Sequence, residues 1–146
     1  DVYKRQVWGK FGAAGLFLVA GNQVLLQHRA AWTNHGDTWG IPGGARDKPE
    51  TAVDAALRET TEETGIAAAD VEVLDSMVTA GPFDGGWTYT TVLARTVSGQ
   101  CLDTTANEES TELRWVAFSD VDALNLLGPF RSALPGVLAR WEELNS

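Results

Sequence analysis

The sequence is poor in the residues that support thiol or imidazole chemistry. It contains one cysteine, Cys101, and two histidines among 146 residues. A single cysteine excludes an internal disulfide and favours a reducing compartment, so we expect a cytoplasmic protein. Neither histidine lies in a recognisable nucleophile motif. We therefore interpret Cys101 as a buried or incidental thiol and not as a catalytic nucleophile.

Basic residues are also scarce. The 11 lysines and arginines face 20 aspartates and glutamates, which gives a net charge of -9. Such a chain is unsuited to non-specific binding of nucleic acid polymers, which requires a basic surface. An acidic surplus can serve solubility alone. If several acids converge on one site, however, that site would suit divalent cations.

The chain lacks a long hydrophobic run and an initiator methionine. Its longest apolar run, Ala13–Ala20, has the length of a strand and falls far short of a membrane span of roughly 20 residues, so we expect no membrane partner. The only methionine is Met77. Residues 1–6 resemble the translation of an adapter used in DNA sequencing libraries, and we expect them to be an artefact. Residues 7–146 are long enough for a single domain with one core.

Local patterns predict strands on both sides of one internal helix. Strands over Ala14–Ala20 and Val24–Arg29 should form a hairpin through the Gly21-Asn22 turn. Further extended segments are predicted over Trp39–Pro42, Val71–Thr79, Trp87–Thr96 and Leu113–Phe118, with a break at Pro42-Gly43-Gly44 and a polar turn over Ala45–Glu50.

Three helices are predicted. The strongest covers Thr51–Thr64 and ends at Gly65, because glycine tolerates the left-handed conformation that ends a helix. Ser119 should cap a short helix over Asp120–Leu126. The last helix should run from Leu134 or Pro135 to Leu144. This order of strands and helices indicates a layered α/β domain.

On a helical wheel, the central helix separates an apolar sector from an acidic one. Val53, Leu57, Thr60 and Thr64 fall together and should face the sheet. Glu59 and Glu63 share another sector with Ala52, Ala55 and Ala56, which should leave room above this face. Glu62 lies at the edge of that sector, and Arg58 points away from the carboxylates.

Gathered carboxylates destabilise a helix. Like charges four residues apart cost a few tenths of a kcal/mol, and negative charge near a helix C-terminus opposes the helix dipole. A hard divalent cation would reverse the sign of the interaction. For Glu62 and Glu63 alone, a solvated acidic face would be the better interpretation.

A longer pattern changes that judgement. It consists of Gly44, Glu50, Arg58-Glu59, Glu62-Glu63 and Gly65-Ile66, at spacings that resemble the signature of the Nudix hydrolase family. Eight of its nine specified positions are met over 23 residues. The departure is Thr60, where the family usually has an aliphatic residue. Outside the pattern, Trp39–Gly44 and Leu113–Val116 also look like family segments. The resemblance implies an α/β/α sandwich with a mixed β-sheet.

The resemblance also implies roles for individual residues. Glu59 and Glu63 would be the principal ligands of Mg²⁺ or Mn²⁺, with Glu62 in support and the carbonyl of Gly43 as a backbone ligand. Arg58 would orient a glutamate, and Glu50 is a plausible partner for it. A later loop should supply one more carboxylate as ligand or general base. Glu109 is preferred to Glu108, although their segment could be only a polar turn.

The implied activity is metal-dependent hydrolysis of a pyrophosphate bond in a nucleoside diphosphate linked to another group. The compact chain looks more like members that cleave nucleoside triphosphates, including oxidised ones such as 8-oxo-dGTP. The alternative is ADP-ribose, because Pro82 follows Ile66 at a spacing seen in members that cleave it. A nucleotide sensor without catalysis would usually have a degraded pattern. Candidate substrate-binding residues are Arg29, Trp32, Phe83 and Trp87, and the protein should be a monomer or a homodimer.

Overall fold

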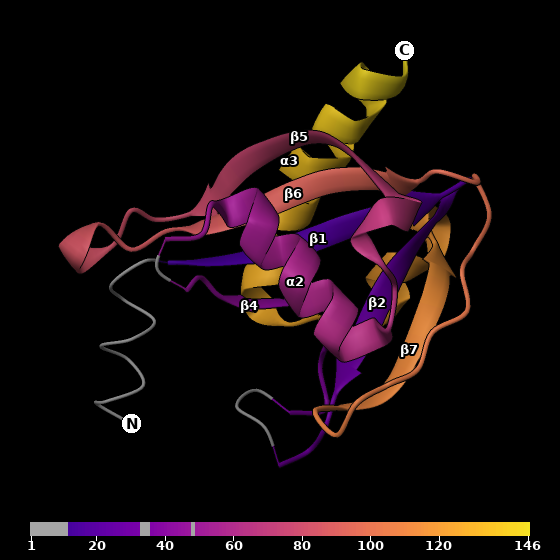
Figure 1. The fold of residues 1–146 in the computed structure, drawn as a ribbon, viewed down its shortest axis with the longest axis horizontal. Helices are drawn as coiled ribbons and strands as arrows, with labels where there is room; N and C mark the ends of the chain where they lie inside the picture. The colour runs from indigo at the N-terminus through magenta and orange to yellow at the C-terminus, as the bar shows by residue number, and fades with distance from the viewer. Residues whose placement is uncertain (1–11, 33–35, 48) are drawn as a thin grey trace.

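A computed structural model describes residues 12–32, 36–47 and 49–146 as three layers, with one mixed sheet between two long helices (Figure 1). The artefact predicted for residues 1–6 lies outside the described residues. The strands are β1 (Ala13–Ala20), β2 (Gln23–Arg29), β3 (Trp39–Gly40), β4 (Gly43–Ala45), β5 (Val71–Ala80), β6 (Tyr89–Thr96) and β7 (Ser110–Ala117). The helices are α2 (Ala52–Thr64) and α3 (Gly128–Asn145), with short 3₁₀ segments η1 (Ala68–Asp70), η2 (Asp84–Gly86) and η3 (Phe118–Ala123). The predicted α/β/α sandwich is confirmed.

The sheet opens between β1 and β2. Its order is β3-β2-β1-β6-β5, with β4 added on β1 and β7 on β2, and the β1–β6 pair is parallel while the others are antiparallel. The end of β1 pairs with β2 at Val19 and Val24, but its start pairs with β4 at Gly15 and Gly43. Because β2 instead follows β7 along its whole length, the later residues of β2 face β4 across an opening.

Alternate residues of β1 serve two cores. Leu16 and Leu18 pack under α2, whereas Phe17 and Val19 pack on the side of α3. All four are essentially inaccessible to solvent, as expected for a central strand covered on both faces. In the described residues, no helix is long and apolar enough to cross a membrane.

The orientation predicted for α2 is right for Thr60 and Thr64, which are buried, and wrong for Val53 and Leu57. Ala55 and Ala56 are completely buried against β1, while Val53 and Leu57 are only partly buried beside the same core. Small alanine side chains let the helix approach the strand closely, so the alanine sector faces the sheet and not open space. As a consequence Glu63, which shares that sector, is also buried.

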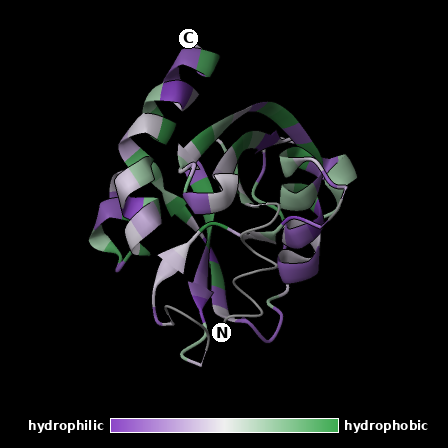
Figure 2. Ribbon diagram, turned by 90° about the vertical axis from the view of Figure 1, so that its left-hand side faces the viewer, coloured by the Kyte–Doolittle hydropathy of each residue, from purple (hydrophilic) through white to green (hydrophobic). Residues whose placement is uncertain are grey.

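The ends of α2 agree with the prediction, because they depend on local signals. Thr51 caps the helix with its hydroxyl, which accepts a hydrogen bond from the Asp54 N–H at 3.1 Å. Gly65 ends it in the left-handed region at φ 81°. Figure 2 shows α2 changing from mostly apolar residues in its first half to hydrophilic residues in its second half.

Three other predicted boundaries are wrong. α3 begins at Gly128, and Pro135 lies inside it and not at its start. The missing N–H of Pro135 removes one helical bond, which is offset because Phe130, Leu134, Val137 and Trp141 all bury on one side. Ser119 lies inside η3, whose first residue has no side-chain cap. The predicted break after Trp39 is present at Ile41-Pro42, but Gly43 and Gly44 lie beyond it and form β4 by pairing with β1.

Candidate active site

The opening between β1 and β2 forms a cavity of about 280 Å³ beside α2. Four segments contribute to it: the end of β2, the β4 strand with the residues after it, the second half of α2, and the loop before β7. Its lining residues are Gln27, Arg29, Gly43, Gly44, Ala45, Asp47, Arg58, Glu59, Glu63 and Glu109. The sequence prediction gave six of these a role in the site and named Gly44 in the family pattern, and the cavity brings all seven together.

Glu63 is the most enclosed carboxylate of the cavity, with only 5% of its surface exposed. Its Oε1 accepts hydrogen bonds from the Gly43 N–H at 3.2 Å and from Nε2 of Gln27 at 3.1 Å. Burial raises the pKa of Glu63 to about 8, and the negative charge of Glu59 adds to this effect. The two hydrogen bonds oppose the shift without cancelling it.

Glu59 lies beside Glu63 and against the backbone of β4. Burial raises the pKa of Glu59 to about 7, even though the positive charge of Arg58 opposes the shift. A Cβ atom added to Gly44 would lie 2.5–2.8 Å from the Glu59 carboxylate. A side chain at this position would therefore displace the Glu59 carboxylate.

Arg58 holds the outer edge of the site. Its Nε and Nη2 donate to the two carboxylate oxygens of Glu50 at 2.6 and 2.9 Å, and Nη2 also donates to the Ala45 carbonyl at 3.1 Å. The predicted partnership with Glu50 is present, and it lowers the pKa of Glu50. The prediction that Arg58 points away from the carboxylates is wrong, because its long side chain reaches within 3.7 Å of Glu59 and 3.3 Å of Glu62.

Glu62 faces outward and Glu109 faces inward. The side chain of Glu62 is more than half exposed beside Arg58 and does not line the cavity. Glu109 does line it, whereas Glu108 does not. The Glu109 N–H donates to Oδ1 of Asn107 at 3.0 Å, and its carbonyl accepts from the Ala30 N–H at 3.0 Å. The negative charge of Glu109 also raises the pKa values of both Glu59 and Glu63 inside the cavity.

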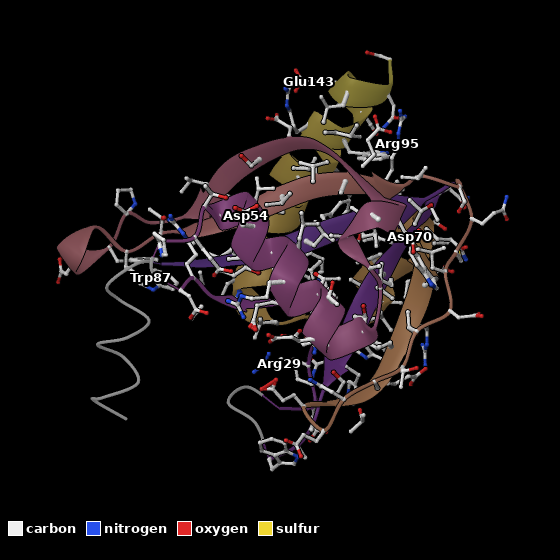
Figure 3. The ribbon with its side chains drawn as sticks, in the orientation of Figure 1. Arg29, Asp54, Asp70, Trp87, Arg95 and Glu143 are labelled. Carbon is white, nitrogen blue, oxygen red and sulfur yellow. The ribbon has the colours of Figure 1, made fainter. Side chains whose placement is uncertain are left out.

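The candidate substrate-binding residues do not all meet. Arg29 lines the cavity, and Trp32 lies just beyond β2 with 69% of its surface exposed. Phe83 and Trp87 pack against each other at 5.4 Å between ring centres, and neither lines the cavity. Figure 3 shows Arg29 beneath the second half of α2 and Trp87 well away from it, toward the β5–β6 connection.

Three lining residues, Gln27, Ala45 and Asp47, were not predicted. Gln27 precedes Arg29 by two positions on β2 and therefore shares its face of the strand. Period-two alternation applied from Arg29 could have identified Gln27. Asp47 lies in the loop after β4 and approaches Arg58 at 3.5 Å. The sequence around Asp47 carries no comparable signal, because its place depends on the pairing of β4 with β1.

The orientation of the Gly43 carbonyl follows from the register of β4. The Leu16 N–H donates to the Pro42 carbonyl at 2.9 Å, and Gly43 is paired with Gly15. Hydrogen-bonded and non-hydrogen-bonded pairs alternate along an antiparallel ladder, so both polar groups of Gly43 point away from β1. Its N–H meets Glu63, and its carbonyl is directed to the same side.

The donor set suits a hard divalent cation. Three carboxylates and one backbone carbonyl are oxygen donors, which Mg²⁺ and Mn²⁺ accept. The raised pKa values of Glu59 and Glu63 show that their charges are poorly compensated by the protein. Over residues 12–32, 36–47 and 49–146, no three acidic, histidine or cysteine side chains are already gathered closely enough to hold an ion. The donors therefore fit a metal in kind, and at least one of the other carboxylates must move toward Glu63 to complete the ligand set.

Comparison with known proteins adds independent findings. The family model described as the NUDIX domain matches residues 9–140. A Mycobacterium tuberculosis protein, provisionally named 8-oxo-dGTP diphosphatase 3, is 48% identical over 147 residues that cover 95% of this chain and 64% of that protein. The chain thus spans just under two thirds of that relative's length.

Two further relatives extend the comparison. A Bifidobacterium longum nucleoside triphosphate pyrophosphatase/Nudix hydrolase fusion protein is 41% identical over 96% of this chain and 30% of its own length. The crystal structure of RenU, a Nudix hydrolase from M. smegmatis, superposes with a TM-score of 0.83 at 43% identity, covering 91% of this chain and 88% of RenU.

Proposed function

The chain belongs to the Nudix hydrolase family, and from that premise we propose that it is a metal-dependent pyrophosphohydrolase. The substrate class is nucleoside triphosphates, including oxidised ones such as 8-oxo-dGTP, with a monophosphate and pyrophosphate as products. One observation carries the proposal: the carboxylates of Glu59, Glu63 and Glu109 and the guanidinium groups of Arg29 and Arg58 line the same cavity.

The proposed chemistry follows from charge. A pyrophosphate bridge is anionic and repels hydroxide; bound Mg²⁺ would neutralise phosphoryl oxygens and lower the pKa of water. Glu59, Glu63 and the Gly43 carbonyl would hold the cation, with Glu62 in an outer position. Its exposed side chain beside Arg58 suits that supporting role.

The other lining residues would bind phosphate and move a proton. Arg29 presents a cation to the phosphate chain from β2. Glu109 approaches from a different element than α2, so it can accept the proton of the attacking water while the helix carboxylates hold the cation. Arg58 is a positioning residue in this proposal, because its bidentate pair with Glu50 fixes the guanidinium beside Glu59.

The size of the cavity suits the phosphate groups of a nucleotide substrate. At about 280 Å³ it can enclose a phosphate chain but not a whole nucleotide. The base would then lie outside, where the exposed ring of Trp32 is available for stacking. The name of the M. tuberculosis relative points to the same substrate class.

A nucleotide panel tests this function. The purified protein is incubated with Mg²⁺ and dGTP, 8-oxo-dGTP, ATP or ADP-ribose, and products are separated by chromatography. We expect pyrophosphate and a monophosphate in equal amounts from at least one triphosphate. Turnover of ADP-ribose alone would replace the triphosphate proposal with the alternative. Tight binding without turnover of any compound would identify a sensor instead.

A further inference from the structure

Gln27 is a buried polar residue that joins two parts of the cavity wall. It belongs to β2 and is 3% exposed. Its amide Nε2 donates to Oε1 of Glu63 at 3.1 Å and to the hydroxyl of Ser110 at 2.7 Å. Both protons of one amide group are therefore used, one toward α2 and one toward the first residue of β7.

The two partners of Gln27 belong to the segments that supply the carboxylates. Glu63 is one of those carboxylates, and Ser110 directly follows Glu109. The loop that carries Glu109 is also tied to the end of α2, since the Thr105 N–H donates to the Thr64 carbonyl at 2.9 Å. Gln27 thus closes a ring of contacts that runs from α2 through the loop to β7 and back.

The hydrogen bonds of Gln27 also select one oxygen of Glu63. Oε1 accepts hydrogen bonds from Nε2 of Gln27 and from the Gly43 N–H. Among the described residues, no hydrogen bond to Oε2 is present. A carboxylate held through one oxygen presents the other in a fixed direction. Supporting contacts of this kind commonly orient the groups that bind a metal ion.

We propose that Gln27 is a positioning residue that orients Glu63 for cation binding and links it to the Glu109-bearing segment through Ser110. This inference rests on the proposed function and adds a residue outside the family pattern to it. A purely structural glutamine would need only to satisfy its own amide. Gln27 instead donates both N–H groups to Glu63 and Ser110, and it lines the cavity itself.

The test compares Mn²⁺ binding to folded variants, measured from the electron paramagnetic resonance signal of free Mn²⁺. Gln27→Met keeps the size of the side chain and removes both donors. We expect its Kd for Mn²⁺ to rise about 10- to 100-fold, the usual effect of losing a contact that supports a metal ligand. Ser110→Ala should weaken Mn²⁺ binding less. The double variant should have the same Kd as Gln27→Met, because Ser110 acts on Glu63 only through Gln27.

A matched control is available on β6. Thr96 is also buried, and its hydroxyl has no partner in the described residues, so Thr96→Val should leave the Kd unchanged. In kinetics at saturating Mn²⁺, Gln27→Met should lower kcat with little change in the KM of the nucleotide.

The outcomes distinguish the positioning role of Gln27 from the proposed hydrolase function. A folded Gln27→Met variant with the wild-type Kd overturns the positioning role, and if that variant does not fold, an unchanged Kd in Ser110→Ala does so. Wild-type protein that binds Mn²⁺ but turns over no nucleotide removes the proposed function and leaves the comparison of Kd values decisive for Gln27. Wild-type protein that binds no Mn²⁺ overturns both.

Discussion

At the scale of single residues, the burial of Glu63 governs the electrostatics of the site. The carboxylate lies in the sector of α2 that faces the sheet, where water cannot stabilise its charge. Its pKa of about 8 in the folded chain exceeds the ordinary value of 4.5. Folding is therefore linked to proton binding at Glu63 whenever no metal is present.

Glu63→Gln should reveal this linkage in chelator. Because the folded pKa is raised, the contribution of Glu63 to stability is fully present below pH 4.5 and is lost as the pH rises through about 8. A glutamine does not titrate, and its carbonyl can accept the same two hydrogen bonds. We expect nearly equal stability at pH 5 and a variant more stable by a few kcal/mol at pH 8.5. Thermal melts at both pH values measure this, and a difference that does not change with pH would contradict it.

Gly44 and Gly136 form a contrasting pair of glycines. Alanine at Gly44 would push a methyl group into the Glu59 carboxylate, whereas alanine at Gly136 in α3 meets nothing within 4 Å. We expect Gly44→Ala to lower the turnover number at least tenfold by displacing Glu59. Gly136→Ala should keep full activity and add about 0.5–1 kcal/mol of stability through helix propensity. Initial rates and melts of both variants provide the check, and a fully active Gly44→Ala would argue against a role for Glu59.

At the scale of elements, the loop before β7 delivers Glu109 to the cavity while its neighbour Glu108 stays outside. The two residues have the same chemistry and adjacent positions, so they form a natural control pair. Glu109→Gln should reduce turnover by about 10²- to 10⁴-fold, the usual contribution of a general base. Glu108→Gln should leave turnover within twofold of wild type. Equal effects of the two substitutions would count against a specific role for Glu109.

The packing of α2 gives a second prediction at this scale. Leu18 on β1 is completely buried under α2, whereas Leu57 on α2 is only partly buried. Leu18→Ala should therefore destabilise the protein by about 2–5 kcal/mol, and Leu57→Ala by less than about 2 kcal/mol. Urea unfolding of both variants measures the difference. If Leu57→Ala were the more damaging change, the observed orientation of α2 would be wrong.

The sequence predicts those elements whose signals are local. Thr51 and Gly65 mark the ends of α2 through side-chain and backbone preferences that need no tertiary contact. β4 was missed because Gly43 becomes a strand residue only through Gly15, which is distant in sequence. The wheel places only part of the sheet-facing side of α2 correctly for the same reason, since the close approach of Ala55 and Ala56 to β1 depends on tertiary packing.

At the scale of the whole molecule, the fold concentrates charge where the sheet opens. The start of β1 pairs with β4 and its end pairs with β2. The acidic second half of α2 crosses the opening between them (Figure 1). Residues from four segments can then surround one cavity without interrupting either core. The net charge of -9 fits this arrangement, because a cation would offset part of it.

The most direct test of the central claim is the rate of pyrophosphate release from 8-oxo-dGTP and dGTP, for wild type and Glu63→Gln, with Mg²⁺ and with excess chelator. We expect wild-type turnover with Mg²⁺, fastest at alkaline pH, and none in chelator. Glu63→Gln, folded by circular dichroism, should be slower by at least 100-fold, since a lost metal ligand removes several kcal/mol of transition-state stabilisation. Full wild-type turnover in chelator, or an unchanged rate in folded Glu63→Gln, would contradict the account.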